Sequence, residues 1–201
     1  MKLSNKFTLM RVCFAPFFFF LYFIPIWTNS ALLGRISAFL LIPLLALFEL
    51  TDYFDGHYAR KSGEVSDFGK LFDPFADVML NLTVFMCVQW SMAGRSYMPP
   101  VIFLLILYRE LGMSFLRMIA MKNGTAIAAR KGGKVKTVFY IASGFYALVL
   151  ESAFRLDVAI AVNSALLRGI ALGMFVSCLV LSYVSFIDYL MRFSARIRSE
   201  L

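Results

Sequence analysis

Four aspartates stand in two close pairs on either side of a short polar segment. Asp52 and Asp55 are three positions apart, and Asp73 and Asp77 are four positions apart. On a helix, either spacing places both carboxylates on one face. Antiparallel packing of the two segments would bring all four carboxylates together, where they repel one another unless a cation lies among them. Because oxygen ligands favour hard divalent ions, the pattern predicts one or two bound ions of the Mg²⁺, Mn²⁺ or Ca²⁺ type.

Small and basic residues follow the first aspartate pair. Gly56 and Ala59 carry no bulky side chain, so a ligand or another helix can approach the backbone there. The planar guanidinium of Arg60 suits a phosphate. Pro74 is expected in the first turn of the second helix, where its missing N–H would have no partner in any case. Together, the metal site, the arginine and the open backbone indicate a phosphate-bearing ligand.

The same residues resemble the signature of the CDP-alcohol phosphotransferase family. Eight residues are specified over 26 positions, and this chain has all of them: Asp52-x2-Asp55-Gly56-x2-Ala59-Arg60-x8-Gly69-x3-Asp73-x3-Asp77. The resemblance implies an all-α integral membrane enzyme with six transmembrane helices that forms a homodimer. It also implies transfer of a phosphate-linked group from a CDP-activated donor to an alcohol.

The resemblance further implies a role for each signature position. Asp52 and Asp73 would each bridge two Mg²⁺ or Mn²⁺ ions, Asp55 would bind one ion, and Asp77 would bind the other. Asp77 would also act as the general base that accepts the proton of the attacking hydroxyl. The CDP group would be held by Asn5, Thr8, Gly56, Arg60 and Ser66.

Three further segments are similar to the phosphatidylglycerolphosphate synthase branch of that family in bacteria. They are Asn5-x2-Thr8-x2-Arg11 with Pro16, Arg109-Glu110 with Ser114 and Arg117, and Gly133-Lys134-Val135-Lys136-Thr137. This similarity implies CDP-diacylglycerol as donor, sn-glycerol 3-phosphate as acceptor and CMP as leaving group. Val78 departs from that branch, in which a lysine often follows the last aspartate.

A second set of charged residues offers a site for the phosphate of the acceptor. Glu110 and Arg117 share one helical stripe, and charged residues inside a span usually face the protein interior or a water-filled cavity. We predict that four cations bind the acceptor phosphate: Arg109, Arg117, Lys134 and Lys136. The alternatives are buried pairing with Glu110 for the two arginines, and a topological role for the two lysines.

The composition shows which elements must position these residues. Hydrophobic residues make up 61% of the 201, charged residues make up 16%, and the mean hydropathy is +0.77. Soluble domains are nearer ~45–50% apolar, so this composition excludes one. A span needs about 20 apolar residues, so the chain holds a single membrane-embedded catalytic domain over 1–201. We predict spans over 8–28, 36–60, 70–92, 99–121, 135–154 and 166–191.

The distribution of lysine and arginine predicts the orientation. Only Arg35, Arg95, Arg155 and Arg168 lie on the side opposite the termini. By the positive-inside rule, both termini and the active site then face the cytoplasm. The same rule explains the net charge of +8 without a nucleic-acid partner. The resemblance to the bacterial branch of the family implies a bacterial inner membrane. Fourteen cations lie on the side of the termini: Lys2, Lys6, Arg11, Arg60, Lys61, Lys70, Lys122, Arg130, Lys131, Lys134, Lys136, Arg192, Arg196 and Arg198.

Two other functions are compatible with the same residues. One is a CDP-alcohol phosphotransferase with a different acceptor, such as inositol phosphate, serine or a phospholipid. The other is a cation transporter, because carboxylates within a membrane also bind ions in transit. A transporter would place its carboxylates near the midplane, whereas these adjoin a positively flanked loop.

Overall fold

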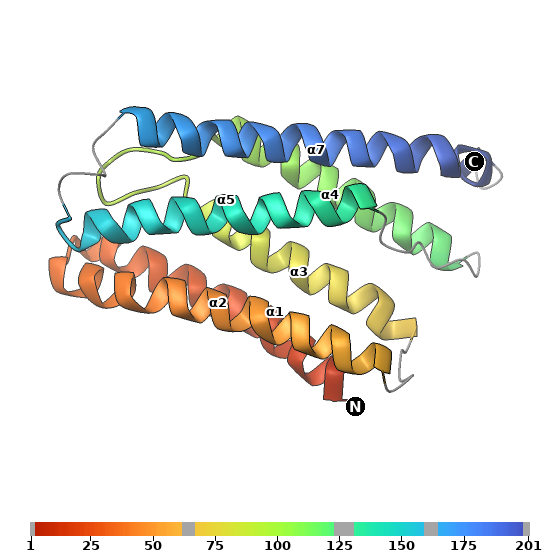
Figure 1. The fold of residues 1–201 in the computed structure, drawn as a ribbon, viewed down its shortest axis with the longest axis horizontal. Coiled ribbons are helices and arrows are strands. Elements are labelled where there is room, and N and C mark those ends of the chain that lie inside the picture. The colour runs from red at the N-terminus through yellow and green to blue at the C-terminus, as the bar shows by residue number, and fades with distance from the viewer. Residues whose placement is uncertain (1–2, 62–66, 123–130, 159–164, 199–201) are drawn as a thin grey trace.

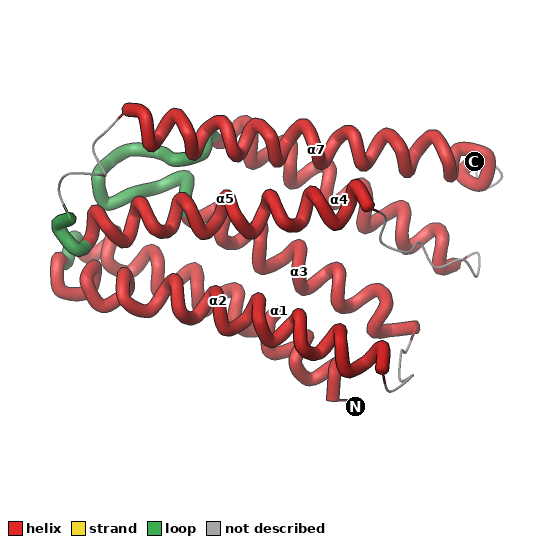
Figure 2. Tube along the Cα trace, in the orientation of Figure 1, coloured by secondary structure: helices red, strands yellow, loops and turns green. Residues whose placement is uncertain are grey.

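The computed structural model describes residues 3–61, 67–122, 131–158 and 165–198, and it describes side chains over 8–51, 71–121, 132–158 and 165–191 and at residue 69. These residues form helices and loops, with no strand (Figure 2). The predicted all-α fold class is therefore confirmed. The six described helices are α1 (Leu3–Thr28), α2 (Ala31–Lys61), α3 (Asp67–Cys87), α4 (Pro100–Lys122), α5 (Lys131–Arg155) and α7 (Ala165–Arg198).

Four of these helices contain segments that are long and apolar enough to cross a membrane. The segments are Thr8–Thr28, Ala31–Thr51, Gly132–Arg155 and Ala165–Met191. The other two helices, α3 and α4, are 21 and 23 residues long and carry four charged residues each. The chain is a multi-pass membrane protein, and the number of six spans stays a prediction.

Each predicted span overlaps one helix, and α3 ends before the residue predicted to end the third span. α3 ends at Cys87, five residues before the predicted end at residue 92. The amide of Trp90 donates to the carbonyl of Cys87 at 3.0 Å, and the amide of Met92 donates to Oε1 of Glu151 at 3.1 Å. The chain leaves the helix there because its loop binds a buried carboxylate on α5.

The helices run along the long axis of an elongated bundle, and both termini lie at one end (Figure 1). α1 packs against both α2 and α3, and α2 also packs against α5. α7 packs against α5 and α4, and α4 also packs against α3. α2 and α4 end, and α3 and α5 begin, at the end where the termini lie (Figure 1). The ends of α2 and α3 that flank the predicted aspartate pairs therefore lie at the same end of the bundle as the termini (Figure 1).

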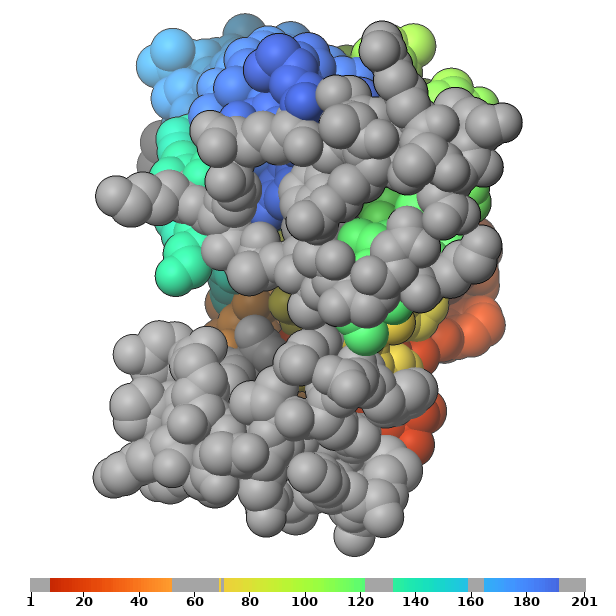
Figure 3. Space-filling model, turned by 90° about the vertical axis from the view of Figure 1, so that its right-hand side faces the viewer, coloured from red at the N-terminus to blue at the C-terminus, as the bar shows by residue number. Residues whose placement is uncertain are grey.

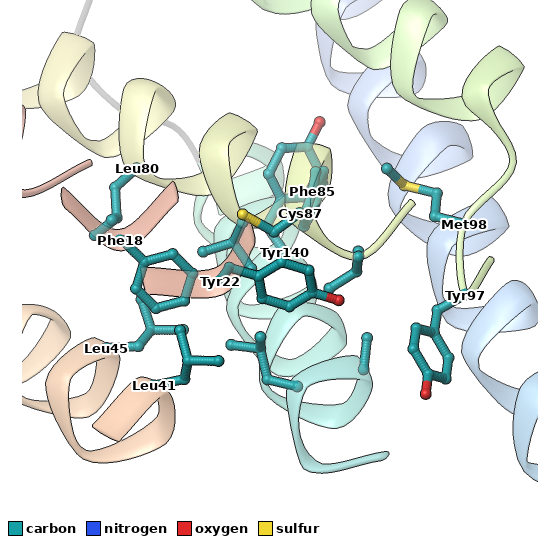
Figure 4. Close-up of a cluster of buried hydrophobic side chains, with 14 of the residues drawn as sticks. Phe18, Tyr22, Leu41, Leu45, Leu80, Phe85, Cys87, Tyr97, Met98 and Tyr140 are labelled. Carbon is teal, nitrogen blue, oxygen red and sulfur yellow. The ribbon is translucent and has the colours of Figure 1, made fainter. Parts of the chain in front are cut away.

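The apolar core fills the middle of the bundle (Figure 4). Phe18 on α1, Leu41 on α2 and Phe85 on α3 are fully buried. The ring of Phe85 meets that of Phe175 on α7 edge to face, with centroids 5.2 Å apart. Other large apolar side chains, such as Phe17, point outward, as expected where lipid replaces water.

A polar cluster lies at the end of the bundle opposite the termini, and we call it the Glu151 cluster: Ser37, Ser91, Tyr97, Glu151 and Arg155. Oε2 of Glu151 accepts from Ser91 at 2.5 Å and from Tyr97 at 3.2 Å. Oε1 accepts from Nε of Arg155 at 2.8 Å. Burial and the Glu151 carboxylate raise the pKa of Tyr97 above its ordinary value, so its hydroxyl stays protonated and donates.

Arg155 extends the cluster to two more helices. Its Nη1 donates to Oγ of Ser37 on α2 at 2.6 Å, and its Nη2 donates to the carbonyl of Tyr22 on α1 at 3.2 Å. The guanidinium also lies 4.4 Å from the centroid of the Tyr22 ring. One buried ion pair thus connects α1, α2, α5 and the loop before α4.

Candidate active site

α1 and α3 hold two of the predicted aspartates between them. Thr8 Oγ1 donates to Oδ1 of Asp73 at 2.6 Å, and Arg11 forms an ion pair with Asp77. Thr8 and Arg11 are buried, whereas both aspartates are only partly buried. Two α1 residues that are three positions apart thus face two α3 residues that are four positions apart. The packing of α1 on α3 therefore orients both carboxylates.

Pro74 lies between these aspartates, and its predicted position in the first turn is wrong. α3 begins at Asp67, so Pro74 is in the helix interior. Proline has no N–H, so the carbonyl of residue 70 loses its usual helical donor. The carbonyl of Asp77 instead gains an extra donor, because Asn81 Nδ2 binds it at 2.8 Å. The helical hydrogen bonds are therefore altered on both sides of the predicted general base.

A cavity of about 300 Å³ lies between α3, α4, α5 and α7, near the end of the bundle that carries the termini. Figure 3 views that end, with α7 above, α5 at the left and α4 at the right. Asp77 lines the cavity, as do all four cations that the sequence predicts for the acceptor phosphate: Arg109, Arg117, Lys134 and Lys136. The predicted general base and the predicted phosphate ligands thus lie around one cavity.

A buried carboxylate joins two of these cations, and we call the group the Glu110 cluster: Arg109, Glu110, Lys136 and Tyr140. Oε1 of Glu110 accepts from Nη1 of Arg109 at 2.8 Å, from Nζ of Lys136 at 2.8 Å and from the hydroxyl of Tyr140 at 2.9 Å. Nζ of Lys136 also lies 4.4 Å from the centroid of the Tyr140 ring. The pairing with Glu110 that the sequence left open as an alternative is therefore present for Arg109.

The other two cations are more accessible. Arg117 is partly buried, and Lys134, in the first turn of α5, is exposed. Both line the cavity. The cavity therefore has two cations fixed by Glu110 and two cations in more solvent-accessible positions.

The remaining predicted site residues lie outside the described side chains. They are Asn5, Asp52, Asp55, Gly56, Arg60 and Ser66. Among the described side chains, no three of His, Cys, Asp or Glu come close enough to hold a metal ion. Asp73 and Asp77 fit a hard cation because carboxylate oxygens are its preferred ligands. They lie in the first half of α3, which begins at the end of the bundle where α2, the helix that carries Asp52 and Asp55, ends (Figure 1). The four-aspartate metal site stays a prediction.

Several residues that line the cavity were not predicted from the sequence, and three of them carry hydroxyl groups. Tyr140 on α5 and Ser185 and Tyr189 on α7 are all buried there. Ser185 and Tyr189 are four positions apart, so they lie on one helical face. A polar pair at helical spacing within an apolar span is the signal that could have found them.

The chain is similar to known proteins over most of its length. A model of the family described as CDP-alcohol phosphatidyltransferase matches residues 1–181. The chain belongs to the CDP-alcohol phosphatidyltransferase family. The match includes Thr8, Asp73, Asp77 and most of the cavity, and it ends within α7, before Ser185 and Tyr189. The family resemblance predicted from the aspartate signature is therefore confirmed.

Curated relatives in this family carry consistent names. A protein of Treponema pallidum named CDP-diacylglycerol--glycerol-3-phosphate 3-phosphatidyltransferase is 38% identical over 96% of this chain and 89% of its own length. A Bacillus subtilis protein of the same name is 34% identical over 68% of this chain and 70% of its own length. A Mycobacterium tuberculosis protein named probable phosphatidylglycerophosphate synthase is 33% identical over 86% of this chain and 78% of its own length.

Proposed function

We propose that this enzyme transfers the phosphatidyl group of CDP-diacylglycerol to sn-glycerol 3-phosphate and releases CMP. The observation that carries the proposal is the cavity in which Asp77 lies together with Arg109, Arg117, Lys134 and Lys136. The acceptor brings a hydroxyl that must lose a proton and a phosphate that must be bound. The cavity has a carboxylate for the first task and cations for the second. The names of the curated relatives agree with this reaction.

The charge of the cavity favours a phosphate-bearing acceptor. Its described lining has four cations and two carboxylates, Asp77 and Glu110, which leaves a formal charge of +2. A phosphate monoester carries about −1.5 to −2 charges near neutral pH, so it balances this excess. Serine has no net charge and would leave the cations uncompensated. Val78 also lines the cavity, and the four cations of the lining come from α4 and α5.

Asp77 is positioned to act as the general base. Its ion pair with Arg11 holds the carboxylate at the wall of the cavity. The cavity beside it would place the acceptor hydroxyl within reach of the carboxylate. The hydroxyl oxygen would then attack the phosphorus that carries the diacylglycerol group, and CMP would leave in line.

Two divalent ions, Mg²⁺ or Mn²⁺, would complete the donor side of the site. Asp52, Asp55, Asp73 and Asp77 would hold them, and when bound they would neutralise the diphosphate and the departing CMP. Thr8 would act by holding Asp73, since its hydroxyl already donates to that carboxylate. Asn5, Gly56, Arg60 and Ser66 would contact the CDP group.

The proposal also covers the orientation of the enzyme in the membrane and its oligomeric state. Both termini lie at the end of the bundle that carries the cavity (Figure 1). We place that end on the cytoplasmic side of a bacterial inner membrane, where the positive-inside rule puts most of the lysines and arginines. The enzyme would act as a homodimer, as the family resemblance implies. Labelling of an engineered terminal cysteine in intact vesicles tests the orientation, and cross-linking in the membrane tests the dimer.

A panel of acceptors tests the proposed reaction. Purified enzyme is given CDP-diacylglycerol, Mg²⁺ and one labelled acceptor: glycerol 3-phosphate, inositol phosphate or serine. We expect lipid-soluble label with glycerol 3-phosphate and a far lower rate with the other two. Transfer to inositol phosphate or serine, without transfer to glycerol 3-phosphate, would contradict the proposed acceptor while leaving the reaction class intact.

A further inference from the structure

Glu110 has no assigned role in the proposed reaction. It lies on α4 and is 2% exposed, although it lines the cavity. A buried carboxylate is costly unless it is paired, and this one is paired through a single oxygen. Its three donors come from α4 and α5: Arg109, Lys136 and Tyr140. One oxygen atom thus fixes the places of two cations on two helices.

Both cations keep hydrogen-bonding capacity for a ligand. Arg109 uses Nη1 on Glu110 and Nε on the carbonyl of Ser182, at 2.8 Å, while no described residue binds its Nη2. Lys136 uses one of its three N–H donors on Glu110. A phosphate in the cavity could therefore accept from both side chains without displacing Glu110.

The carboxylate also offsets the repulsion between the two cations. Arg109 is 3% exposed and Lys136 is 8% exposed, so water screens their mutual repulsion poorly. Glu110 lies between them and compensates for that repulsion before any substrate is present. Donors that are already oriented lose little freedom when a ligand arrives, which strengthens its binding.

We propose that Glu110 is a positioning residue for the acceptor phosphate: it holds Arg109 and Lys136 so that their remaining N–H groups face the ligand. This inference rests on the proposed function, because it assumes an acceptor that carries phosphate. Tyr140 shares the role, since its hydroxyl donates to the same oxygen and its ring lies beside the lysine.

The test is the Glu110→Gln variant. Glutamine keeps the shape and one acceptor oxygen but removes the charge that orients both cations. We expect the KM for glycerol 3-phosphate to rise at least about tenfold, with kcat and the KM for CDP-diacylglycerol within about twofold of wild type. Inorganic phosphate, used as a competitive inhibitor against glycerol 3-phosphate, should lose affinity by a similar factor.

Two further variants separate positioning from stability. Glu151→Gln is the matched control, because it neutralises an equally buried carboxylate that does not line the cavity. It should lower thermal stability and leave both KM values unchanged. Tyr140→Phe keeps the ring and removes one donor, so it should raise the KM for glycerol 3-phosphate alone, by about threefold. This milder variant decides the question if Glu110→Gln does not fold.

Each outcome has a defined meaning. Equal changes in the two KM values, or no change in either, would overturn the positioning role. A lower KM for glycerol 3-phosphate would also overturn it, because Glu110 would then be only a counter-charge that weakens anion binding. If the wild-type enzyme transfers nothing to glycerol 3-phosphate, the proposed function fails instead, whatever the variants do.

Discussion

The Glu110 cluster and the Glu151 cluster use the same chemistry at opposite ends of the bundle. Each surrounds a buried glutamate with an arginine, a tyrosine and further donors, which are Lys136 at Glu110 and Ser91 and the Met92 amide at Glu151. In the Glu151 cluster both carboxylate oxygens accept hydrogen bonds, and the residues do not line the cavity. In the Glu110 cluster all three donors converge on Oε1, and the whole cluster lines the cavity.

This difference separates a structural use of buried charge from a functional one. Arg155 has three hydrogen bonds, to Glu151, Ser37 and Tyr22, so its guanidinium is committed to the fold. Arg109 has hydrogen bonds on Nε and Nη1 and borders open volume. In a membrane, both clusters must offset the cost of burying charge. Of the two, only the Glu110 cluster retains donors for a ligand.

The largest expected effect is at the cavity, on the residue proposed as general base. Asp77→Asn removes the proton acceptor and keeps the side-chain size. We expect kcat to fall by about 10²–10⁴, the range typical of a lost general base, while CDP-diacylglycerol and metal still bind. The measurement is transfer of labelled glycerol 3-phosphate to lipid.

Asp157→Asn is the control for that change. Asp157 is an exposed carboxylate at the opposite end of the bundle, paired with Arg35, so its loss should leave kcat unchanged. Full activity in Asp77→Asn would overturn its assignment as the base.

The next largest effect should be on stability, at the Glu151 cluster. Arg155→Met removes the cation and leaves a fully buried carboxylate without its charged partner. Loss of one member of a buried pair costs about 3–5 kcal/mol, so the free energy of unfolding should fall by that amount. Thermal unfolding in a mild detergent measures it, and kcat per folded molecule should not change.

A double variant sharpens the interpretation of that result. Glu151→Gln combined with Arg155→Met removes both charges, and it should recover part of the lost stability because no lone buried charge remains. If the single variant lowers kcat as strongly as it lowers stability, the two clusters are not functionally separate.

A smaller effect is expected for an arginine of the Glu110 cluster. Arg109→Ala removes donors proposed for the acceptor phosphate, so the KM for glycerol 3-phosphate should rise about 10- to 100-fold. The KM for CDP-diacylglycerol should change much less. Arg109→Lys keeps the charge but loses the planar fork. Its KM for glycerol 3-phosphate should therefore lie between the values for the wild type and Arg109→Ala. Equal effects on both substrates would remove Arg109 from the acceptor site.

The sequence predicts the elements that carry the cavity better than it predicts the polar clusters. Apolar runs of span length locate all six described helices, because burial in lipid demands them. Asp77 on α3 and the arginines Arg109 and Arg117 on α4, which the sequence singles out for chemistry, also lie around one cavity.

The sequence does not predict contacts between distant segments. Arg155 looked like a topological charge, yet it is buried against Ser37, 118 positions away along the chain. α3 ends at Cys87, and the following loop binds Glu151 through the amide of Met92. The apolar run around Trp90 gives no sign of this contact. Both outcomes depend on which helices pack together, and periodicity within one segment does not specify that.

The smallest expected effect comes from a second ion pair, at the end of the bundle that carries the Glu151 cluster. Arg35 Nη2 and Asp157 Oδ2 are 2.8 Å apart, the same distance as Arg155 Nε and Glu151 Oε1. The Arg35 and Asp157 side chains are 58% and 75% exposed, however, so water screens the attraction and solvates each partner alone. Arg35→Gln should therefore change the free energy of unfolding by no more than about 1 kcal/mol, measured in the same thermal experiment as Arg155→Met. A loss as large as that of Arg155→Met would mean that burial does not distinguish these two pairs, and that the stability of this end depends on its surface as much as on its interior.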